Sequence, residues 1–208
     1  MLSFIPSTAT SVLDVGCGLG GFGRALKERR PGVRVVGVES DARAVAVASD
    51  RYDEVVCGEF PTALPDHEGG FDCIVFNDIL EHLRDPWSAL AAASELLSPA
   101  GRVVASIPNL RYWPVLWRLV AHGEFRYVDD GVLDRTHLRF FTRKSMTELL
   151  VASGFDVERI EPINPLKLDA VSPRQRRFLR GVSTLRPTLA AELLAPQYAV
   201  VGLPRRPA

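Results

Sequence analysis

The sequence lacks an excess of charge, a cysteine framework and any long apolar run. Its 25 basic and 25 acidic residues cancel, so the composition provides no strong field to attract nucleic acid or an anionic membrane. Cys17, Cys57 and Cys73 are an odd number without a C-x-x-C pair, which disfavours disulfides and a zinc site. No stretch approaches the roughly 20 apolar residues of a membrane span, and no signal peptide is recognisable. We therefore expect a cytoplasmic protein with no nucleic-acid partner and no membrane span.

Strand-like and helix-like segments alternate along most of the chain, which predicts a doubly wound α/β sheet. We expect one domain over residues 1–208, with two long insertions at about 109–135 and 165–195 that serve as a lid or cap. The first insertion is expected to be aromatic and irregular, and the second helical and rich in arginine. The expected strands are Ser11–Val15, Val33–Val38, Asp53–Cys57, Phe71–Phe76, Arg102–Ile107, Phe155–Ile160 and Tyr198–Leu203.

A glycine-rich segment, DVGCGLGG, follows the first expected strand and precedes a helical pattern. Glycine has no Cβ, so a ligand can come close to the main chain there. The segment also leads into a helix N-terminus, which favours a carboxylate or a phosphate. Two interpretations fit the spacing: G-x-G-x-x-G, typical of dinucleotide binding, and G-x-G-x-G with an acid two places before the first glycine.

Two carboxyl groups near this segment indicate a nucleoside ligand. Glu39, at the end of the second expected strand, can accept hydrogen bonds from both hydroxyls of a ribose, whether in NAD or in S-adenosylmethionine. Asp14 helps to choose between these ligands, because an anion repels a diphosphate and attracts an ammonium group. Asp14 therefore favours S-adenosylmethionine, which carries an α-amino group and a sulfonium.

Five blocks of the sequence resemble the class I S-adenosylmethionine-dependent methyltransferases. Together with the later helix and strands, they extend the resemblance over nearly the whole chain. The resemblance implies a doubly wound, mostly parallel seven-stranded sheet with helices on both faces, a Rossmann-like methyltransferase fold, and an antiparallel last strand. The blocks are VLDVGCGLGGFG (Val12–Gly23), GVES (Gly37–Ser40), CGEF (Cys57–Phe60), FDCIVFNDILEHLRDP (Phe71–Pro86) and LLSPAGRVVASIPN (Leu96–Asn109).

The resemblance also implies the residues that bind S-adenosylmethionine. The glycine loop would lie against the amino-acid portion of the cofactor, the residues after the second strand would hold the ribose, and those after the third would bracket the adenine. Many members have Asp at the position of Glu59, so this chain departs from the pattern there. The implied residues are Asp14, Gly16, Cys17 and Gly18 for the amino-acid portion, Glu39 and Ser40 for the ribose, Glu59 and Phe60 for the adenine, and Asn77 and Asp78 for the methionine arm.

Two histidines are the candidate catalytic bases. His82 belongs to a D-x-x-E-H segment that begins at Asp78 and resembles the E-x-x-E-H segment of ubiquinone-pathway O-methyltransferases, where it is associated with a divalent ion. Two carboxylates and an imidazole can chelate a metal, but the segment also fits an acidic helix start with a histidine facing the pocket, and we predict no metal. His137 lies in DRTHLRFFT (Asp134–Thr142), which resembles small bacterial methyltransferases linked to glycan or secondary metabolism.

The predicted function is methyl transfer from S-adenosylmethionine to an acceptor, expected to be an oxygen on a small molecule or a sugar. The base-amino motif N-P-P-Y is missing, since the fourth strand ends in NDIL. Two alternatives stay open at this stage: an NAD-binding oxidoreductase-like domain, and a non-catalytic methyltransferase-fold subunit that binds another enzyme. The sequence makes no prediction of the oligomeric state.

Overall fold

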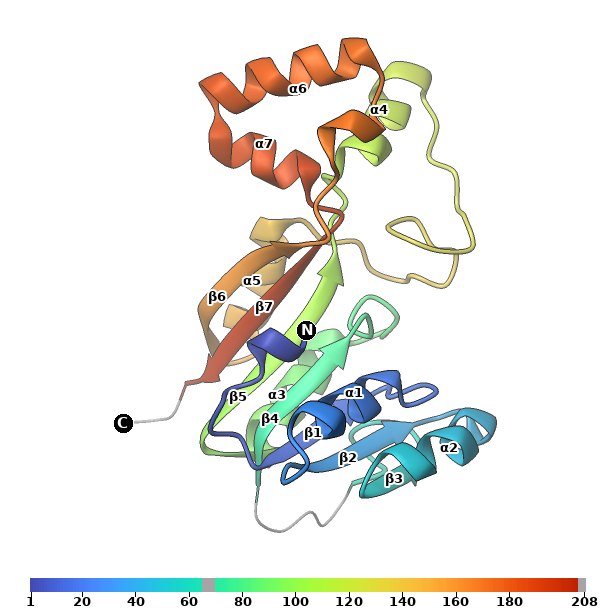
Figure 1. Cartoon of the computed structure of the whole chain (residues 1–208), viewed down its shortest axis with the longest axis vertical. Helices are drawn as coiled ribbons and strands as arrows, with labels where there is room; N and C mark the ends of the chain where they lie inside the picture. The colour runs from blue at the N-terminus through green and yellow to red at the C-terminus, as the bar shows by residue number, and fades with distance from the viewer. Residues whose placement is uncertain (65–69, 206–208) are drawn as a thin grey trace.

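A computed structural model describes residues 1–64 and 70–205 and contains one seven-stranded sheet (Figure 1). The strand order is β3-β2-β1-β4-β5-β7-β6. The expected strands are all present, with ends that differ by a few residues. Their bounds are β1 Ser11–Val15, β2 Arg34–Glu39, β3 Glu54–Cys57, β4 Phe71–Asn77, β5 Leu97–Pro108, β6 Phe155–Ile163 and β7 Gln197–Pro204.

The sheet is mostly parallel, and the last strand is antiparallel to both of its neighbours. β1 pairs in parallel with β2 and β4, and β7 pairs antiparallel with β5 and β6. The chain winds outward from β1 to β3 and then returns to place β4 on the other side of β1. This reversal leaves a crevice at the carboxyl ends of β1 and β4, where doubly wound sheets bind ligands. The predicted doubly wound fold is confirmed.

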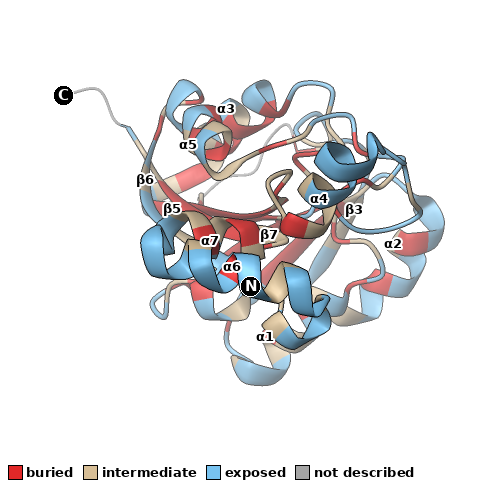
Figure 2. Cartoon of the chain, turned by 90° about the horizontal axis from the view of Figure 1, so that it is seen from above, coloured by how far each residue is buried: buried red, intermediate tan, exposed pale blue. Residues whose placement is uncertain are grey.

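Helices cover both faces of the sheet, and each face has its own buried core (Figure 2). Leu90 of α3 and Leu150 of α5 pack on one face, whereas Leu26 of α1 and Ala48 of α2 pack on the other. The strands between them are buried on both sides, which explains their near-continuous apolar sequences. The bounds of these helices are α1 Gly21–Arg29, α2 Ala42–Ala48, α3 Pro86–Leu96 and α5 Arg143–Ala152, with short 3₁₀ helices at Leu2–Phe4 and Ser49–Arg51.

Local signals in the sequence fix where two of these helices begin. The Asp85 carboxylate accepts a hydrogen bond from the Ser88 amide at 3.1 Å at the start of α3. Thr142 and Ser145 form a capping box at the start of α5, in which each side chain bonds the other residue's main chain. These contacts satisfy amides that have no partner within the helix. The fifth strand starts earlier than the expected Arg102. β5 begins at Leu97, which pairs with Phe71, and residues 98–101 form an irregularity before pairing with β4 resumes at Arg102 and Cys73.

Three further helices, α4 Trp113–His122, α6 Pro173–Leu185 and α7 Pro187–Leu194, form a cap at the end of the molecule far from β3 (Figure 1). The cap has its own apolar cluster around Trp113, Leu179 and Leu193. The first insertion, at about 109–135, was expected to be irregular. This expectation is wrong for residues 113–122, which form the helix α4. Proline stands in the first turn of α4, where its missing amide does no harm, and Gly123 ends the helix with a φ of +68°.

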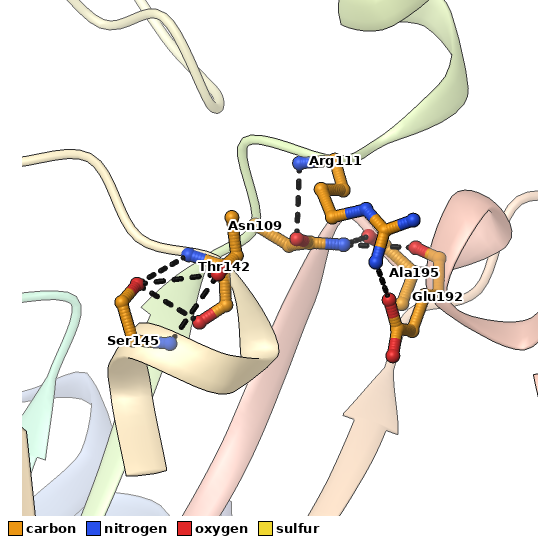
Figure 3. Close-up of polar contacts among 6 residues, drawn as sticks. All are labelled: Asn109, Arg111, Thr142, Ser145, Glu192 and Ala195. Atoms are coloured by element: carbon orange, nitrogen blue, oxygen red, sulfur yellow. Dashed lines mark hydrogen bonds and ion pairs between the residues drawn. The ribbon is translucent and has the colours of Figure 1, made fainter. Parts of the chain in front are cut away.

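Asn109 joins the cap to the sheet at the end of β5 (Figure 3). Its Nδ2 donates to the carbonyl oxygens of Glu192 and Ala195, each at 2.8 Å, and its Oδ1 accepts from the Arg111 amide at 3.0 Å. The Arg111 guanidinium also pairs with the Glu192 carboxylate. Asn109 is fully buried, so this one side chain holds the exit from β5 against the end of α7.

Among the described residues, no helix combines the length and the apolar character needed to cross a membrane.

Candidate functional site

The glycine loop between β1 and α1 folds back over the end of β2. The amides of Gly16 and Cys17 both donate to the Val38 carbonyl, at 2.8 and 3.1 Å. Gly16 has a φ of +69°, and a Cβ built on it would lie 2.1 Å from Cδ1 of Ile79. Both the backbone conformation and the close approach of Ile79 therefore require glycine at this position.

Glu39 braces this loop from the end of β2. One carboxylate oxygen accepts from the Gly18 amide at 2.9 Å, and the other accepts from the Asp41 amide at 2.9 Å. The Ser40 hydroxyl lies 3.3 Å from the second oxygen. Glu39 thus links the glycine loop to the start of α2 while it remains partly exposed.

A groove of about 670 Å³ lies beside the loop, at the carboxyl edge of the sheet. Five of the ten residues predicted to bind a cofactor line it. Ile79, Leu83 and Leu138 supply apolar walls, and the acids come from the β2 and β3 ends while His82 and Arg84 follow β4. The five predicted residues are Gly16, Glu39, Ser40, Glu59 and Phe60.

Asp14 lies behind the loop, buried to 1% exposure in β1. Its Oδ2 accepts a hydrogen bond from the Tyr52 hydroxyl at 2.5 Å, and the same hydroxyl accepts from the Gly23 amide at 3.0 Å. Its Oδ1 is buried without a hydrogen-bond partner among the described residues. Burial raises the pKa of Asp14 to about 7, against the opposing effect of the Tyr52 hydrogen bond. Asp14 therefore shapes the loop from within the core.

Gly18 and Cys17, the other two predicted loop residues, are also not among the residues that line the groove. The Gly18 amide is used by Glu39. The Cys17 thiol packs so closely against β2 that a Cβ on Gly37 would lie 2.7 Å from its Sγ. Burial raises the pKa of Cys17 to about 12, so the thiol is protonated at neutral pH and is not a nucleophile.

Asn77 and Asp78, at the end of β4, line a second pocket of about 440 Å³ together with the N-terminal residues 1–4. Asp78 has a φ of +52°, and its Oδ1 accepts from the Ser106 hydroxyl at 3.0 Å and from the Gln197 amide group. The Asn77 Oδ1 is buried without a partner in the described part of the chain. The residues predicted for the ribose and the adenine thus line one pocket, and those predicted for the methionine arm line another.

The two predicted catalytic histidines lie together. Their ring centroids are 4.7 Å apart, in an edge-to-face arrangement. His82 lines the groove, and its Nδ1 lies 3.3 Å from the Thr136 carbonyl, which leaves Nε2 as the acceptor when the ring is neutral. His137 is buried behind it, with Nδ1 at 3.1 Å from the Val132 carbonyl. Burial lowers the pKa of His137, so its ring is neutral at pH 7.

Glu81 completes this cluster from the turn that follows β4. Its carboxyl group is buried, with Oε1 at 3.9 Å from His137 Nε2, and neither oxygen has a hydrogen-bond partner among the described residues. Burial raises the pKa of Glu81 to about 8. Its main-chain carbonyl accepts from the amides of Leu138 and Arg139 at 2.8 and 3.0 Å, which ties this turn to the segment that carries His137.

The same three side chains are the group best placed to hold a metal in the described part of the chain. One ligand atom from each of Glu81, His82 and His137 lies within 4.8 Å of the others. Two imidazoles and one carboxylate suit a transition metal better than Mg²⁺. Asp78, the first acid of the D-x-x-E-H segment, is engaged elsewhere with Ser106 and Gln197. That the site uses no metal stays a prediction.

Sequence analysis did not identify two residues that shape the site, and it placed a third, Glu81, only as a possible metal ligand in the D-x-x-E-H segment. Tyr52 holds Asp14, Ile79 covers Gly16, and Glu81 packs against the histidines. Only Glu81 had a local signal, its place in the D-x-x-E-H segment. Tyr52 lies outside any motif, and its contact with Asp14 spans 38 residues.

Comparison with known proteins gives a family and a fold. The model of a family described as "Methyltransferase domain" matches residues 2–160. A ubiquinone biosynthesis O-methyltransferase of Thiobacillus denitrificans is 34% identical over 173 residues, which are 77% of this chain and 72% of that protein. A 37.1 kDa protein in transposon TN4556 of Streptomyces fradiae is 32% identical over 199 residues, 88% of this chain and 55% of that protein.

A solved structure shares the fold over most of its length. A SAM dependent methyltransferase from Archaeoglobus fulgidus superposes with a TM-score of 0.67 at 22% identity, covering 94% of this chain and 86% of that one. The chain spans between 55% and 66% of the length of three of the curated relatives that it matches.

Proposed function

The chain belongs to the family of class I S-adenosylmethionine-dependent methyltransferase domains, and from this premise we propose that it transfers a methyl group to an oxygen of a small molecule or a sugar. The observation that carries the proposal is the groove beside the glycine loop. Gly16 places no side chain of its own over the backbone, and carboxyl groups from the ends of β2 and β3 line the same groove. Two alternative functions are tested below. Calorimetry tests an NAD-binding domain, and the turnover assay tests a non-catalytic subunit.

The charges of the groove support a cationic nucleoside over a dinucleotide. Two carboxyl groups, Glu39 and Glu59, line it against one guanidinium, Arg84, and Asp14 lies behind the loop. A carboxylate attracts the ammonium and the sulfonium of S-adenosylmethionine and repels a diphosphate. We propose that Glu39 holds the ribose hydroxyls, that Phe60 lies against the adenine, and that Asn77 and Asp78 receive the methionine arm.

The proposed methyl transfer needs three things: alignment of the acceptor oxygen with the methyl group, exclusion of water from the groove, and a base that takes the proton of the acceptor hydroxyl. S-adenosylmethionine, when bound, supplies the methyl group on a good leaving group. Alignment of the acceptor oxygen with that methyl can supply roughly 7–11 kcal/mol of the barrier. Ile79, Leu83 and Leu138 form apolar walls that exclude water. His82 takes the proton from the acceptor hydroxyl through Nε2, and the buried His137 keeps the His82 ring in place by edge-to-face contact.

Isothermal titration calorimetry tests the cofactor assignment. We expect S-adenosylmethionine to give a binding isotherm and NAD to give none. Glu39→Ala is expected to weaken S-adenosylmethionine binding by about 10- to 100-fold, because it removes charged hydrogen bonds to the ribose. Glu148→Ala, which removes an exposed carboxylate on α5, is the matched control and is expected to bind like the parent. Binding of NAD alone, or equal affinity in the Glu39 variant, would refute the assignment.

Release of S-adenosylhomocysteine in the presence of a panel of phenols and sugars tests the base. We expect His82→Ala to lower turnover by roughly 10²–10⁴-fold and to leave S-adenosylmethionine affinity within a few-fold of the parent. His122→Ala, on the exposed end of α4, is the control. Unchanged turnover in the His82 variant would remove this residue from the mechanism. Tight cofactor binding with no turnover on any acceptor would favour the non-catalytic subunit.

A further inference from the structure

The outer surface of the cap exposes several large apolar side chains on two neighbouring helices. Val120 on α4 is 83% exposed, and Leu185 on α6 is 82% exposed. Phe178, on α6, is 52% exposed although it stacks on Trp113 with ring centroids 5.0 Å apart. Trp117 and Leu119 add to this surface. These side chains belong to two helices at the same end of the molecule (Figure 1).

The same two helices carry positive charge and no negative charge. Neither residues 113–122 nor residues 173–186 contain Asp or Glu. Arg176 uses its guanidinium to hold the Leu168 and Asp169 carbonyls. The remaining arginines are exposed, and within the described part of the chain no carboxylate lies within ion-pair distance of them. These residues are Arg118, Arg174, Arg177, Arg180 and Arg186.

The apolar and cationic side chains form one continuous surface. A hollow of about 550 Å³ between α4 and α6 is lined by Trp117, Val120, Phe178 and Arg174. A second hollow of about 580 Å³, between α6 and α7, shares Phe178 and Arg174 and adds Leu185. We call the surface formed by these residues together with Arg177 and Arg186 the cap face. It has an apolar centre, and the charged residues that line its two hollows are all arginines.

We propose that the cap face docks onto the surface of an anionic lipid bilayer. An anionic bilayer satisfies both properties of the cap face at once, because apolar side chains enter the acyl boundary while arginines meet the lipid headgroups. A second copy of the chain fits less well, since a two-fold interface would place this same arginine-rich surface against itself. The net charge of zero does not reveal this cluster of arginines, because the folded structure is needed to bring the cap helices together.

Sedimentation with vesicles tests the proposal. We expect the full chain to sediment with vesicles of equal parts phosphatidylglycerol and phosphatidylcholine, and to stay in solution with phosphatidylcholine alone. Binding is expected to weaken as salt is raised from about 0.01 to 0.15 M, because the Debye length falls from about 30 to 8 Å. This inference does not depend on the proposed function, and the assay needs neither cofactor nor acceptor.

Three variants separate the contributions. Arg174→Gln, Arg177→Gln and Arg186→Gln combined should lower the partition coefficient by about 100-fold, since each cation near the membrane contributes about five-fold. Arg24→Gln, Lys144→Gln and Arg205→Gln combined remove the same charge outside the cap and should leave binding unchanged. Val120→Ser with Leu185→Ser should lower binding at least about tenfold through lost apolar burial. Both of these side chains are so exposed that the fold does not depend on them.

Three results would overturn the proposal. The first is the absence of sedimentation with anionic vesicles at low salt. The second is an equal loss of binding in the cap variant and in its charge-matched control, which would indicate a diffuse attraction. The third is self-association in analytical ultracentrifugation that the Val120 and Leu185 variant abolishes, which would assign the cap face to a second copy of the chain.

Discussion

At the scale of single residues, Asp14 places an ionisable carboxyl group where burial disfavours its charged form. The carboxyl group is buried in β1, and only one of its two oxygens has a hydrogen-bond partner, the Tyr52 hydroxyl, in the described structure. Its pKa of about 7 lies above the ordinary value of 3.8 because burial disfavours the charged form. The folded state therefore binds a proton more tightly than the unfolded state does, and the free energy of unfolding falls as pH rises through this window.

Replacing Asp14 by Asn should remove this pH dependence. The amide keeps an acceptor for Tyr52 and cannot ionise. We expect the difference in unfolding free energy between Asp14→Asn and the parent to grow in favour of the variant from pH 5 to pH 8. The expected increase is about 2 to 3 kcal/mol, since one pKa unit corresponds to about 1.4 kcal/mol. Urea denaturation of the cofactor-free protein at both pH values measures it.

The exposed pair of Asp156 and Arg205 provides the control. Asp156→Asn should show no such gain at pH 8. A pH-independent difference between Asp14→Asn and the parent would mean that Asp14 titrates near its ordinary value in the folded protein.

At the residue scale, the sequence predicts position best where a side chain ends a strand, although the cofactor-binding roles stay predictions. Glu39 and Glu59 follow β2 and β3, so the parallel sheet necessarily brings them to one edge, and both line the groove. Tyr52 could not be predicted, because its contact with Asp14 depends on how α1 and the segment after α2 pack together. Short-range patterns carry no information about such a long-range contact.

At the scale of elements, the chain's alternating strands follow from apolar runs buried on both faces, and this part of the fold was predictable. The helix α4 was not, because Pro114 and two tryptophans hide its periodicity and its packing partners lie more than 60 residues later in α6 and α7. β5 begins at Leu97, before the expected start at Arg102, because Leu97 already pairs with Phe71 of β4; residues 98–101, which include Pro99 and Gly101, form an irregularity before the pairing resumes.

Asn109 is the element-scale contact whose loss should release the cap. Asn109→Ala removes two donors and one acceptor, and leaves the Glu192 and Ala195 carbonyls without their partner. Each buried polar group left unpaired costs about 1–3 kcal/mol. We expect a loss of about 2 to 4 kcal/mol in unfolding free energy, because the cap can relax and restore part of the hydrogen bonding with water.

Hydrogen exchange distinguishes release of the cap from general destabilisation. Amides of α7 should exchange faster in Asn109→Ala, whereas those of β4 should change only as far as global stability falls. Ser183→Ala, an exposed position on α6, is the control within the cap. Unchanged protection of α7 would mean that the apolar cluster around Trp113 and Leu193 holds the cap without Asn109.

At the scale of the whole molecule, the sheet edge, the glycine loop and the segment that carries Leu138 meet at one groove. The glycine loop and the β2 and β3 ends form one wall of the groove, and the segment with Leu138 reaches it from beyond the cap's first helix. A cofactor in this groove would contact the loop after β1, the ends of two further strands and the turn after β4. Binding should therefore stabilise the folded state as a whole.

Linkage sets the size of this effect. A ligand that binds only the folded state adds about 2.7 kcal/mol at 100 times its dissociation constant. For a domain of 150–250 residues, each kcal/mol raises the melting temperature by about 2–4 °C. We therefore expect S-adenosylmethionine at that concentration to raise the melting temperature by about 5 to 10 °C, as measured by scanning calorimetry. NAD at the same concentration should leave it unchanged. Glu39→Ala should show a much smaller shift at the parent's saturating concentration, because its groove lacks the ribose acceptor. An equal shift in this variant would place the cofactor elsewhere in the molecule and would separate the glycine loop from methyl-donor binding.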